Sequence, residues 1–333
     1  MAVPQRTALT LPHPKGVEPT LDMAVWAEKE GYDDLWFADS SGVDALTTAA
    51  AVALKTERVR IGTAIIPVYS RTPAVLASTA HVLNKLSKGR FILGLGSSSQ
   101  VMMENWHGQK FEKPLTRVKE TTLLVKQMLT GEKTDFDGET VSSHGYRQLP
   151  LEKGEQPVYM AALRSAMLEA AAEFSDGVIL NLFPLDALPK MMDHIRIGAE
   201  RAGKKLEDVE VACRHQVIVT DDKAAARNMI RMGFAPYYAT PVYNKFLAWC
   251  GHEDVAALIR EGWAAKDRNK TTGALSDDLI DSIAIIGTKE ECQDRIREYA
   301  AGGITTHIIS CVSPHESQAT YEAFTGSQFS FKG

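Results

Sequence analysis

The stretch Gly94-Leu95-Gly96-Ser97-Ser98-Ser99 combines residue types that suit the binding of a phosphate or of a cofactor ring edge. Glycines permit close approach of the backbone to a ligand, and the three serines offer hydroxyl groups and backbone N–H donors. The stretch begins like the dinucleotide fingerprint G-x-G-x-x-G, but its third position is Ser99 and it follows the fourth expected strand instead of the first. The pattern disfavours a Rossmann domain and leaves two interpretations, a ligand-binding loop or a tight turn between strand and helix.

The segment that follows this loop contains Glu104 and His107, which are candidates for proton transfer. An unperturbed histidine titrates near neutral pH, which suits general acid–base work. The alternative for both residues is a structural or solvated side chain, and Trp106 between them is more typical of packing than of catalysis.

Short apolar runs alternate with helical stretches along the chain, which is typical of βαβ units. We expect strands at residues 7–11, 34–38, 58–66, 90–96, 157–161, 177–181, 209–220 and 306–310. Expected helices include residues 19–30, 44–55, 73–86, 114–129, 165–174 and 289–301. Eight strands that alternate with helices predict an α/β fold, a (β/α)8 TIM barrel with insertions, whose active site lies at the carboxyl ends of the strands. A doubly wound sheet is the competing architecture.

Two insertions are expected within a single domain that spans residues 1–333. Asp137-Gly138 between β-prone residues is a hairpin signal and places the first insertion near 131–149. Asp221-Asp222 supplies a helix N-cap and opens the second, helical insertion near 221–280. The aromatic residues of this second insertion either wall a substrate pocket or form the core of the added helices; they are Tyr237, Tyr238, Trp249 and Trp263.

The composition favours an enzyme that acts on a small molecule. The chain has 333 residues, of which 44% are hydrophobic, and a net charge of −5 without a long run of like charge, which argues against nucleic acid or an anionic membrane as partner. No apolar stretch approaches the roughly 20 residues of a membrane helix, and the start lacks the apolar region of a signal peptide, so we expect a cytoplasmic protein. The four cysteines are scattered and form no C-x-x-C motif, and no H-x-H motif stands at the end of the first expected strand. The sequence therefore does not indicate a metal site.

Several motifs together resemble the bacterial-luciferase-like superfamily, in order and in spacing. They are Leu35-Trp36-Phe37-Ala38-Asp39, Ile61-Gly62-Thr63-Ala64-Ile65-Ile66-Pro67, Arg71-Thr72-Pro73, Leu86-Ser87-Lys88-Gly89-Arg90 and Leu93-Gly94-Leu95-Gly96. Residues 101–115 and 167–177 narrow the resemblance to the branch that is similar to methylenetetrahydromethanopterin reductase. The resemblance covers residues 7–310. It implies a TIM barrel that binds coenzyme F420, or FMN, at its carboxyl mouth, and a homodimer formed through helices of the first half.

The resemblance also implies roles for individual residues. Asp39 would bind the flavin-type ring or act near its reacting carbon, although a helix cap or a turn to Ser41 is the alternative. Gly62, Thr63 and Ala64 would hold the ring through a bulge in the third strand, where the family carries a non-prolyl cis peptide bond. Ser97 and Ser98 would line the side of the cofactor. Asn181, at the end of the sixth strand, would contact substrate.

The loop after the fifth strand departs from the family pattern. The family reads Ala-Ala-Leu-Gly-Pro here, whereas this chain has Ala161-Ala162-Leu163-Arg164-Ser165. The arginine either obstructs the site or offers a charged fork to the cofactor phosphate, with Ser165 at the start of the next helix. We favour the second interpretation, so the cofactor-binding prediction includes Ala162, Leu163, Arg164 and Ser165.

The function implied is an F420-dependent oxidoreductase that transfers a hydride between the deazaflavin and a small organic substrate. An FMN-dependent luciferase-like monooxygenase is the first alternative. A non-catalytic protein that binds deazaflavin or flavin is the second, because of the Arg164-Ser165 departure.

Overall fold

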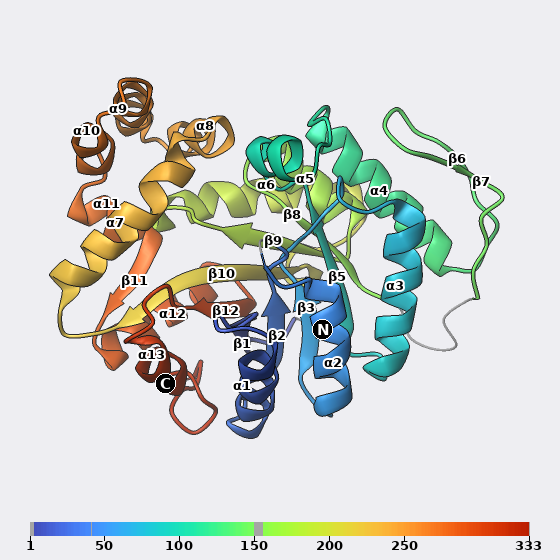
Figure 1. Ribbon diagram of the computed structural model, residues 1–333, viewed down its shortest axis with the longest axis horizontal. Helices are drawn as coiled ribbons and strands as arrows, with labels where there is room; N and C mark the ends of the chain where they lie inside the picture. The colour runs from blue at the N-terminus through green and yellow to red at the C-terminus, as the bar shows by residue number, and fades with distance from the viewer. Residues whose placement is uncertain (1–2, 41, 150–155, 333) are drawn as a thin grey trace.

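The computed structural model describes residues 3–40, 42–149 and 156–332. Its central feature is a closed barrel of parallel strands (Figure 1). Around the ring the strands are β1 (Arg6–Leu11), β2 (Asp34–Phe37), β3 (Arg60–Thr63), β5 (Phe91–Gly96), β8 (Val158–Ala161), β9 (Gly177–Asn181), β10 (Glu210–Val219) and β12 (Thr306–Ser310), and β12 pairs with β1. The predicted (β/α)8 barrel is therefore confirmed, and the doubly wound sheet is excluded.

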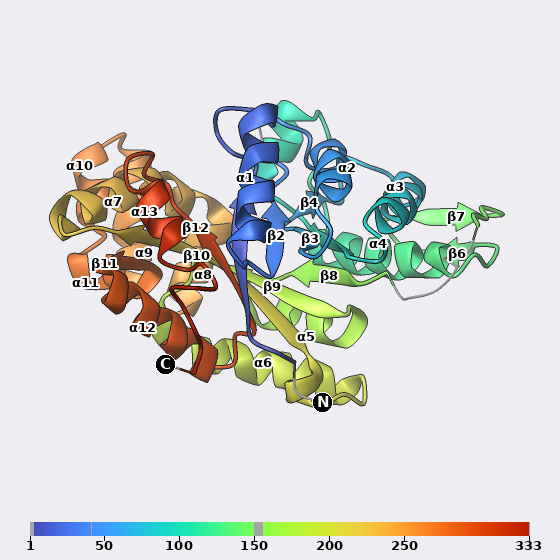
Figure 2. The ribbon, with the colours of Figure 1, turned by 90° about the horizontal axis from the view of Figure 1, so that it is seen from below.

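Helices cover the outside of the barrel (Figure 2). They are α1 (Val17–Lys29), α2 (Ala45–Lys55), α3 (Pro73–Leu86), α4 (Pro114–Leu129), α5 (Ser165–Phe174), α6 (Leu188–Arg201), α12 (Lys289–Ala301) and the short α13 (Ser317–Glu322). Their starts follow local capping chemistry. The Asp44 carboxylate accepts the Thr47 N–H at 2.7 Å to begin α2, and Thr72 with Pro73 begins α3.

Two parts of the chain lie outside the barrel and its ring of helices. β6 (Asp135–Asp137) and β7 (Ser142–His144) form an antiparallel hairpin that projects beside α4 (Figures 1 and 2). On the other side of the molecule lie α7 (Lys223–Ala239), α8 (Pro241–Trp249), α9 (Glu253–Ala264), α10 (Arg268–Gly273) and α11 (Asp277–Ile283). Asp222 caps α7, as expected, and these helices share an apolar cluster that includes Tyr238 and Ile259.

Two features of the strands differ from the expectation. The strand expected at 58–66 is two strands, β3 and β4 (Ile66–Pro67), and the non-prolyl cis peptide bond joins Ala64 to Ile65 between them, one residue beyond the expected stretch 62–64. The structure also has a strand that the sequence analysis missed, β11 (Ala284–Gly287), which pairs with Gln216–Val219 of β10. β10 is ten residues long, so its last residues run past the ring and can pair with a ninth strand.

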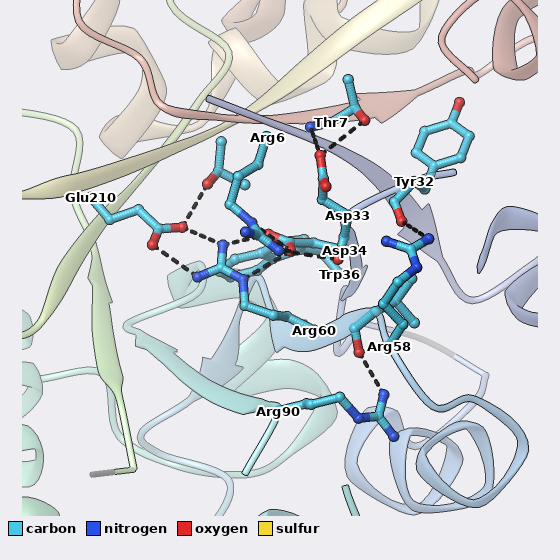
Figure 3. Close-up of polar contacts among 12 residues, drawn as sticks. Arg6, Thr7, Tyr32, Asp33, Asp34, Trp36, Arg58, Arg60, Arg90 and Glu210 are labelled. Carbon is cyan, nitrogen blue, oxygen red and sulfur yellow. Dashed lines mark hydrogen bonds and ion pairs between the residues drawn. The ribbon is translucent and has the colours of Figure 1, made fainter. Parts of the chain in front are cut away.

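The interior of the barrel is filled in two layers below its carboxyl end. At the amino ends of the strands, Arg60 bridges Asp34 and Glu210, with Nη2–carboxylate distances of 2.6 Å to each (Figure 3). Above it lies an apolar layer that contains the rings of Trp36 and Tyr159. Gly62 and Gly177 make room for these rings, since an added Cβ at either glycine would lie 2.6 Å from ring carbons. The lower barrel is therefore a packed core and not a channel.

Within the described residues, no helix is both long enough and apolar enough to cross a membrane.

Candidate active site at the carboxyl ends of the strands

Solvent reaches the inside of the barrel at the carboxyl ends of its strands. Inward-facing residues alternate with outward-facing ones along each strand. The apolar layer is buried, whereas the next inward positions above it are partly exposed: Thr10, Ala64, Ala161, Asn181 and Arg214. The mouth of the barrel is therefore the concave, accessible region that the TIM-barrel fold assigns to an active site.

The side of the mouth formed by β3, β5 and β8 is built from small residues that hold the strands close together. Thr63 Oγ1 accepts the Gly94 N–H at 2.8 Å and donates to the Gly94 carbonyl at 3.0 Å. An added Cβ at Gly94 would lie 1.8 Å from the Thr63 carbonyl oxygen, so only glycine fits there. The Thr63 side chain is thus occupied by the strands themselves, and at this position the backbone is what faces a ligand.

Ser97 and Ser98 follow β5 and lie partly exposed at the rim. Ser98 has a left-handed backbone with φ of 59°, and the Ser97 hydroxyl donates to the Ser98 carbonyl at 3.2 Å. The serine loop predicted from the sequence is thus a turn with accessible hydroxyl groups at the mouth.

Asp39 lies at the end of β2 and is held by two donors. Arg71 Nη1 donates to its carboxylate at 2.6 Å, and the N–H of Ala45, the first residue of α2, donates at 3.2 Å. Arg71 also pairs with Asp44. Burial by itself would lower the pKa of Arg71, but these two carboxylates raise that pKa overall, so Arg71 stays protonated and positively charged. Asp39 therefore has part of the helix-capping role, while Ser41 lies outside the described residues.

Glu104 and His107 lie on the segment that follows the serine loop, outside the strands of the barrel. Both are exposed, on and just after a π-helical turn at Met102–Trp106. The Glu104 carboxylate accepts from Gln100 Nε2 at 3.1 Å and from the Phe111 N–H at 3.4 Å. No hydrogen bond of the described structure joins either residue to Asp39 or to the loop after β8, so their proton-transfer role stays a prediction.

The loop after β8 presents the amino end of α5 to the rim. Arg164 precedes this helix with φ of −126° and ψ of 165°, an extended conformation that any residue adopts, so the replacement of the family glycine creates no backbone strain. Its side chain is exposed, and no side chain caps the N–H groups of the first turn, which begins at Ser165. Ala162 and Leu163 connect β8 to this helix, and the Ala162 N–H donates to Ile179.

Further around the ring from β8, the strands β9, β10 and β12 carry polar residues that the sequence analysis missed, apart from Asn181. Arg214 is paired in register with Asn181 and donates through Nη2 to Ser310 Oγ at 3.0 Å. The signal was present in the sequence Glu210–Val219, where the even-numbered positions Glu210, Ala212, Arg214 and Gln216 face inward and an arginine stands among them.

The aromatic residues of the helical insertion have different environments. Tyr237 is half exposed and its ring meets that of Tyr243 edge-on. Tyr238 is buried and donates to the Leu182 carbonyl at 2.9 Å. Trp249 stacks on Phe246, and Trp263 is exposed. Tyr238 and Trp249 therefore pack among the added helices, as one of the two interpretations expected, whereas a role of Tyr237 in walling a substrate pocket stays a prediction.

The comparisons with known proteins agree with this geometry. A family model described as luciferase-like monooxygenase matches residues 1–306. The chain belongs to the luciferase-like monooxygenase family. A relative from Methanolobus tindarius named 5,10-methylenetetrahydromethanopterin reductase is 30% identical over 309 residues, which cover 91% of this chain and 94% of that protein. A Mycobacterium tuberculosis relative named putative coenzyme F420-dependent oxidoreductase is 28% identical over 324 residues, which cover 89% of this chain and 91% of that protein.

Solved structures of this family share the fold. The coenzyme F420 dependent tetrahydromethanopterin reductase from Methanopyrus kandleri superposes with a TM-score of 0.78, at 21% identity, over 96% of this chain and 97% of that one. The resemblance to the luciferase-like superfamily and to its methylenetetrahydromethanopterin reductase branch, inferred from the motifs, is thereby confirmed. Relatives of this kind are F420-dependent oxidoreductases.

In the part of the chain that the structure describes, no three His, Cys, Asp or Glu side chains are grouped so that they could hold a metal ion.

Proposed function

We propose that this protein is an F420-dependent oxidoreductase that transfers a hydride between the deazaflavin and a small organic substrate at the barrel mouth. The observation that carries the proposal is the free amino end of α5 beside the exposed Arg164, next to the small-residue side of the mouth formed by β3, β5 and β8. The similarity along nearly the whole chain to a relative named putative coenzyme F420-dependent oxidoreductase supports the choice of cofactor.

The residues at the mouth fit a flavin-type cofactor with a phosphate. Backbone N–H groups at the start of a ten-residue helix attract an anion, and an arginine fork adds a charge-assisted donor. Arg164 and Ser165 would hold the phosphate. Ala64, Ser97 and Ser98 would line the ring, because small side chains there let it approach the backbone, whereas the space beside Gly62 is filled by the Trp36 ring.

The bound deazaflavin supplies the hydride chemistry, and the chain supplies orientation and a water-poor surface. The Asp39 carboxylate, fixed by Arg71 and by the start of α2, would position the ring edge instead of moving freely. Glu104 and His107 lie on the exposed turn after β5, where they would exchange protons with solvent. Asn181 faces the mouth from the other side and would meet the substrate.

A titration of the apo-protein with F420 and FMN in parallel tests this proposal and separates its alternatives. Tight binding of F420 and weak binding of FMN, followed by oxidation of bound reduced F420 when an acceptor is added, is the expected result. Preference for FMN would favour the monooxygenase alternative. Tight binding without turnover over a broad panel of imines, activated alkenes and carbonyl compounds would favour the non-catalytic binder.

Arg164→Ala should weaken F420 binding about five- to tenfold and leave the fold intact, because an exposed charge-assisted contact contributes about 1 kcal/mol. The measurement is a fluorescence titration, with thermal unfolding as the check on folding. Arg196→Ala, which removes an exposed arginine from α6, is the control. Unchanged affinity in Arg164→Ala would refute the phosphate role.

We also propose that the protein acts in the cytoplasm as a homodimer that pairs through helices of the first half. Apolar side chains stand exposed on α2 and α3, among them Leu54, Val75 and Val82, with exposed fractions of 69%, 47% and 54%. Their burial between two copies would remove apolar area from water.

A further inference from the structure

Like Arg117, which lies over the Tyr69 ring, Arg214 is a partly buried arginine that forms no ion pair within the described residues. Arg60 binds Asp34 and Glu210, and Arg71 binds Asp39 and Asp44. Arg90 lacks a short ion pair, but four backbone carbonyls accept its N–H groups. Arg214 has five N–H donors and a single recorded acceptor, the Ser310 hydroxyl.

The surroundings of Arg214 are also incompletely hydrogen-bonded. Its Nε is buried without an acceptor. Asn181 Oδ1 on the adjacent strand β9 and Gln216 Oε1 two residues further along β10 are likewise buried without a partner, and so is Thr10 Oγ1 on β1, elsewhere at the mouth. Buried polar atoms in folded proteins are nearly always paired, so a cluster of exceptions requires an explanation, and a bound ligand is one.

The position of Arg214 in the ring of strands places it directly across the mouth from β3. β10 is separated from β3 by three strands in either direction around the eight-stranded ring, β12, β1 and β2 on one side and β9, β8 and β5 on the other, whereas only β9 lies between β10 and β8. A group bound to Arg214 would therefore face β3 across the mouth, with the loop after β8 to one side of it. Tyr237, Tyr243 and Tyr321 lie near the guanidinium and complete its surroundings.

We propose that Arg214 is the receptor for a carboxylate group of the substrate. A planar guanidinium fork matches a carboxylate in shape and in charge. A single cation among neutral hydroxyl groups suits an anion of one charge better than a doubly charged phosphate. The aromatic rings of Tyr237 and Tyr243 suit an apolar body attached to that anion. This inference deepens the proposed function, because it names the substrate class of the proposed hydride-transfer site.

The test compares benzoate with its neutral analogue benzamide as probes, by calorimetric titration of the F420-loaded protein and of the apo-protein. We expect the wild-type protein to bind benzoate about 10- to 100-fold more tightly than benzamide, which is the usual contribution of one hydrogen-bonded charge pair. Arg214→Met should abolish this preference, Arg214→Lys should keep part of it, and Arg196→Met on the exposed face of α6 should keep all of it. Inorganic phosphate should compete poorly with benzoate.

A second readout separates a binding role from a structural one. A guanidinium that lacks a carboxylate is a cost to the fold, so Arg214→Met should unfold at the same temperature as wild type or at a higher one. A loss of stability, an equal affinity of wild type for benzoate and benzamide, failure of benzoate to bind, or strong competition by phosphate would each overturn the proposal.

F420 affinity should be the same in wild type and in Arg214→Met, because Arg214 is not among the residues proposed to hold the cofactor. If the apo-protein prefers benzoate through Arg214 but does not bind F420, the carboxylate site stands and the proposed cofactor fails. If F420 binds and the benzoate preference is absent, the proposed function stands and this inference fails.

Discussion

Glu210 lies at the amino end of β10, where its carboxylate faces Arg60 (Figure 3) and accepts hydrogen bonds from three side chains inside the barrel. Arg60 donates to both carboxylate oxygens, at 2.6 and 3.0 Å. The Tyr159 hydroxyl donates at 2.7 Å, and Thr306 Oγ1 donates at 2.6 Å. The side chain is 10% exposed, so water cannot replace these partners without opening the barrel.

Replacement of Glu210 by glutamine should reduce the free energy of unfolding by about 3–5 kcal/mol, the usual cost of removing one partner from a buried ion pair. In the wild type two guanidinium groups, of Arg6 and Arg60, face two carboxylates, of Asp34 and Glu210. The variant leaves one carboxylate for two cations. The amide NH2 of the new glutamine also opposes the N–H donors of Arg60, which leaves one donor unpaired.

The assay is equilibrium unfolding in guanidinium chloride at neutral pH, followed by circular dichroism. Glu200→Gln is the matched control, because it makes the same chemical change in an exposed pair with Arg196 and should cost less than about 0.5 kcal/mol. A difference of under about 1 kcal/mol between Glu210→Gln and Glu200→Gln would refute the reasoning, since the ionic layer would then contribute no more than a surface pair.

The same variant should change the acid sensitivity of the protein. Burial by itself would raise the pKa of Glu210, but hydrogen bonds from Arg60, Thr306 and Tyr159 hold it below its ordinary value of 4.5. The carboxylate therefore stabilises the native state above that pH, and this contribution is lost as the pH falls through the lower native pKa. Glu210→Gln should lack that component of the acid transition, while Glu200→Gln should retain it.

Two further predictions concern the close approach of β3 to β5 and the buried histidines. Gly94→Ala should destabilise the protein by at least about 1–3 kcal/mol, because its Cβ would lie 1.8 Å from the Thr63 carbonyl oxygen. Gly233→Ala in α7, where nothing lies within 4 Å of the new Cβ, should instead raise the free energy of unfolding by up to about 1 kcal/mol. Chemical denaturation measures both changes, and changes of the same sign in the two variants would contradict this prediction. Burial lowers the pKa of His307 to about 3, so the native state binds fewer protons than the unfolded chain below about pH 6.5 and stability should fall as the pH drops through that window. His307→Asn should flatten this dependence, and an unchanged slope of unfolding free energy against pH would count against it.

Local sequence chemistry was sufficient to place most of the fold. The helices at 73–86, 114–129, 165–174 and 289–301 and the strands at 177–181 and 306–310 have the bounds that periodicity and capping residues predicted. The break within the third strand and the extra strand β11 were not predictable in this way. β11 exists because β10 runs past the barrel, and an apolar run of four residues does not show locally whether a partner strand is present.

Order along the chain also located the candidate site, since the carboxyl ends of parallel strands meet at one end of a barrel. It did not decide what each side chain does there. Asp39 and Arg71 are 32 positions apart, and their pairing depends on the packing of β2 against the start of α3. The position of Arg164 directly after a strand predicted that it binds an anion. That an arginine can replace the family glycine here without backbone strain depends on the extended conformation of the folded loop.

The sequence by itself determined the class of fold, the family and the end of the barrel at which the candidate site lies, because these depend on residue types and on their spacing along the chain. Only the tertiary structure decided which charges are neutralised. Asp34 and Glu210 lie 176 residues apart and share Arg60, while Arg214 has no carboxylate among the described residues. Coulomb interactions depend on distance in space, which the closed barrel sets and the linear order of residues does not.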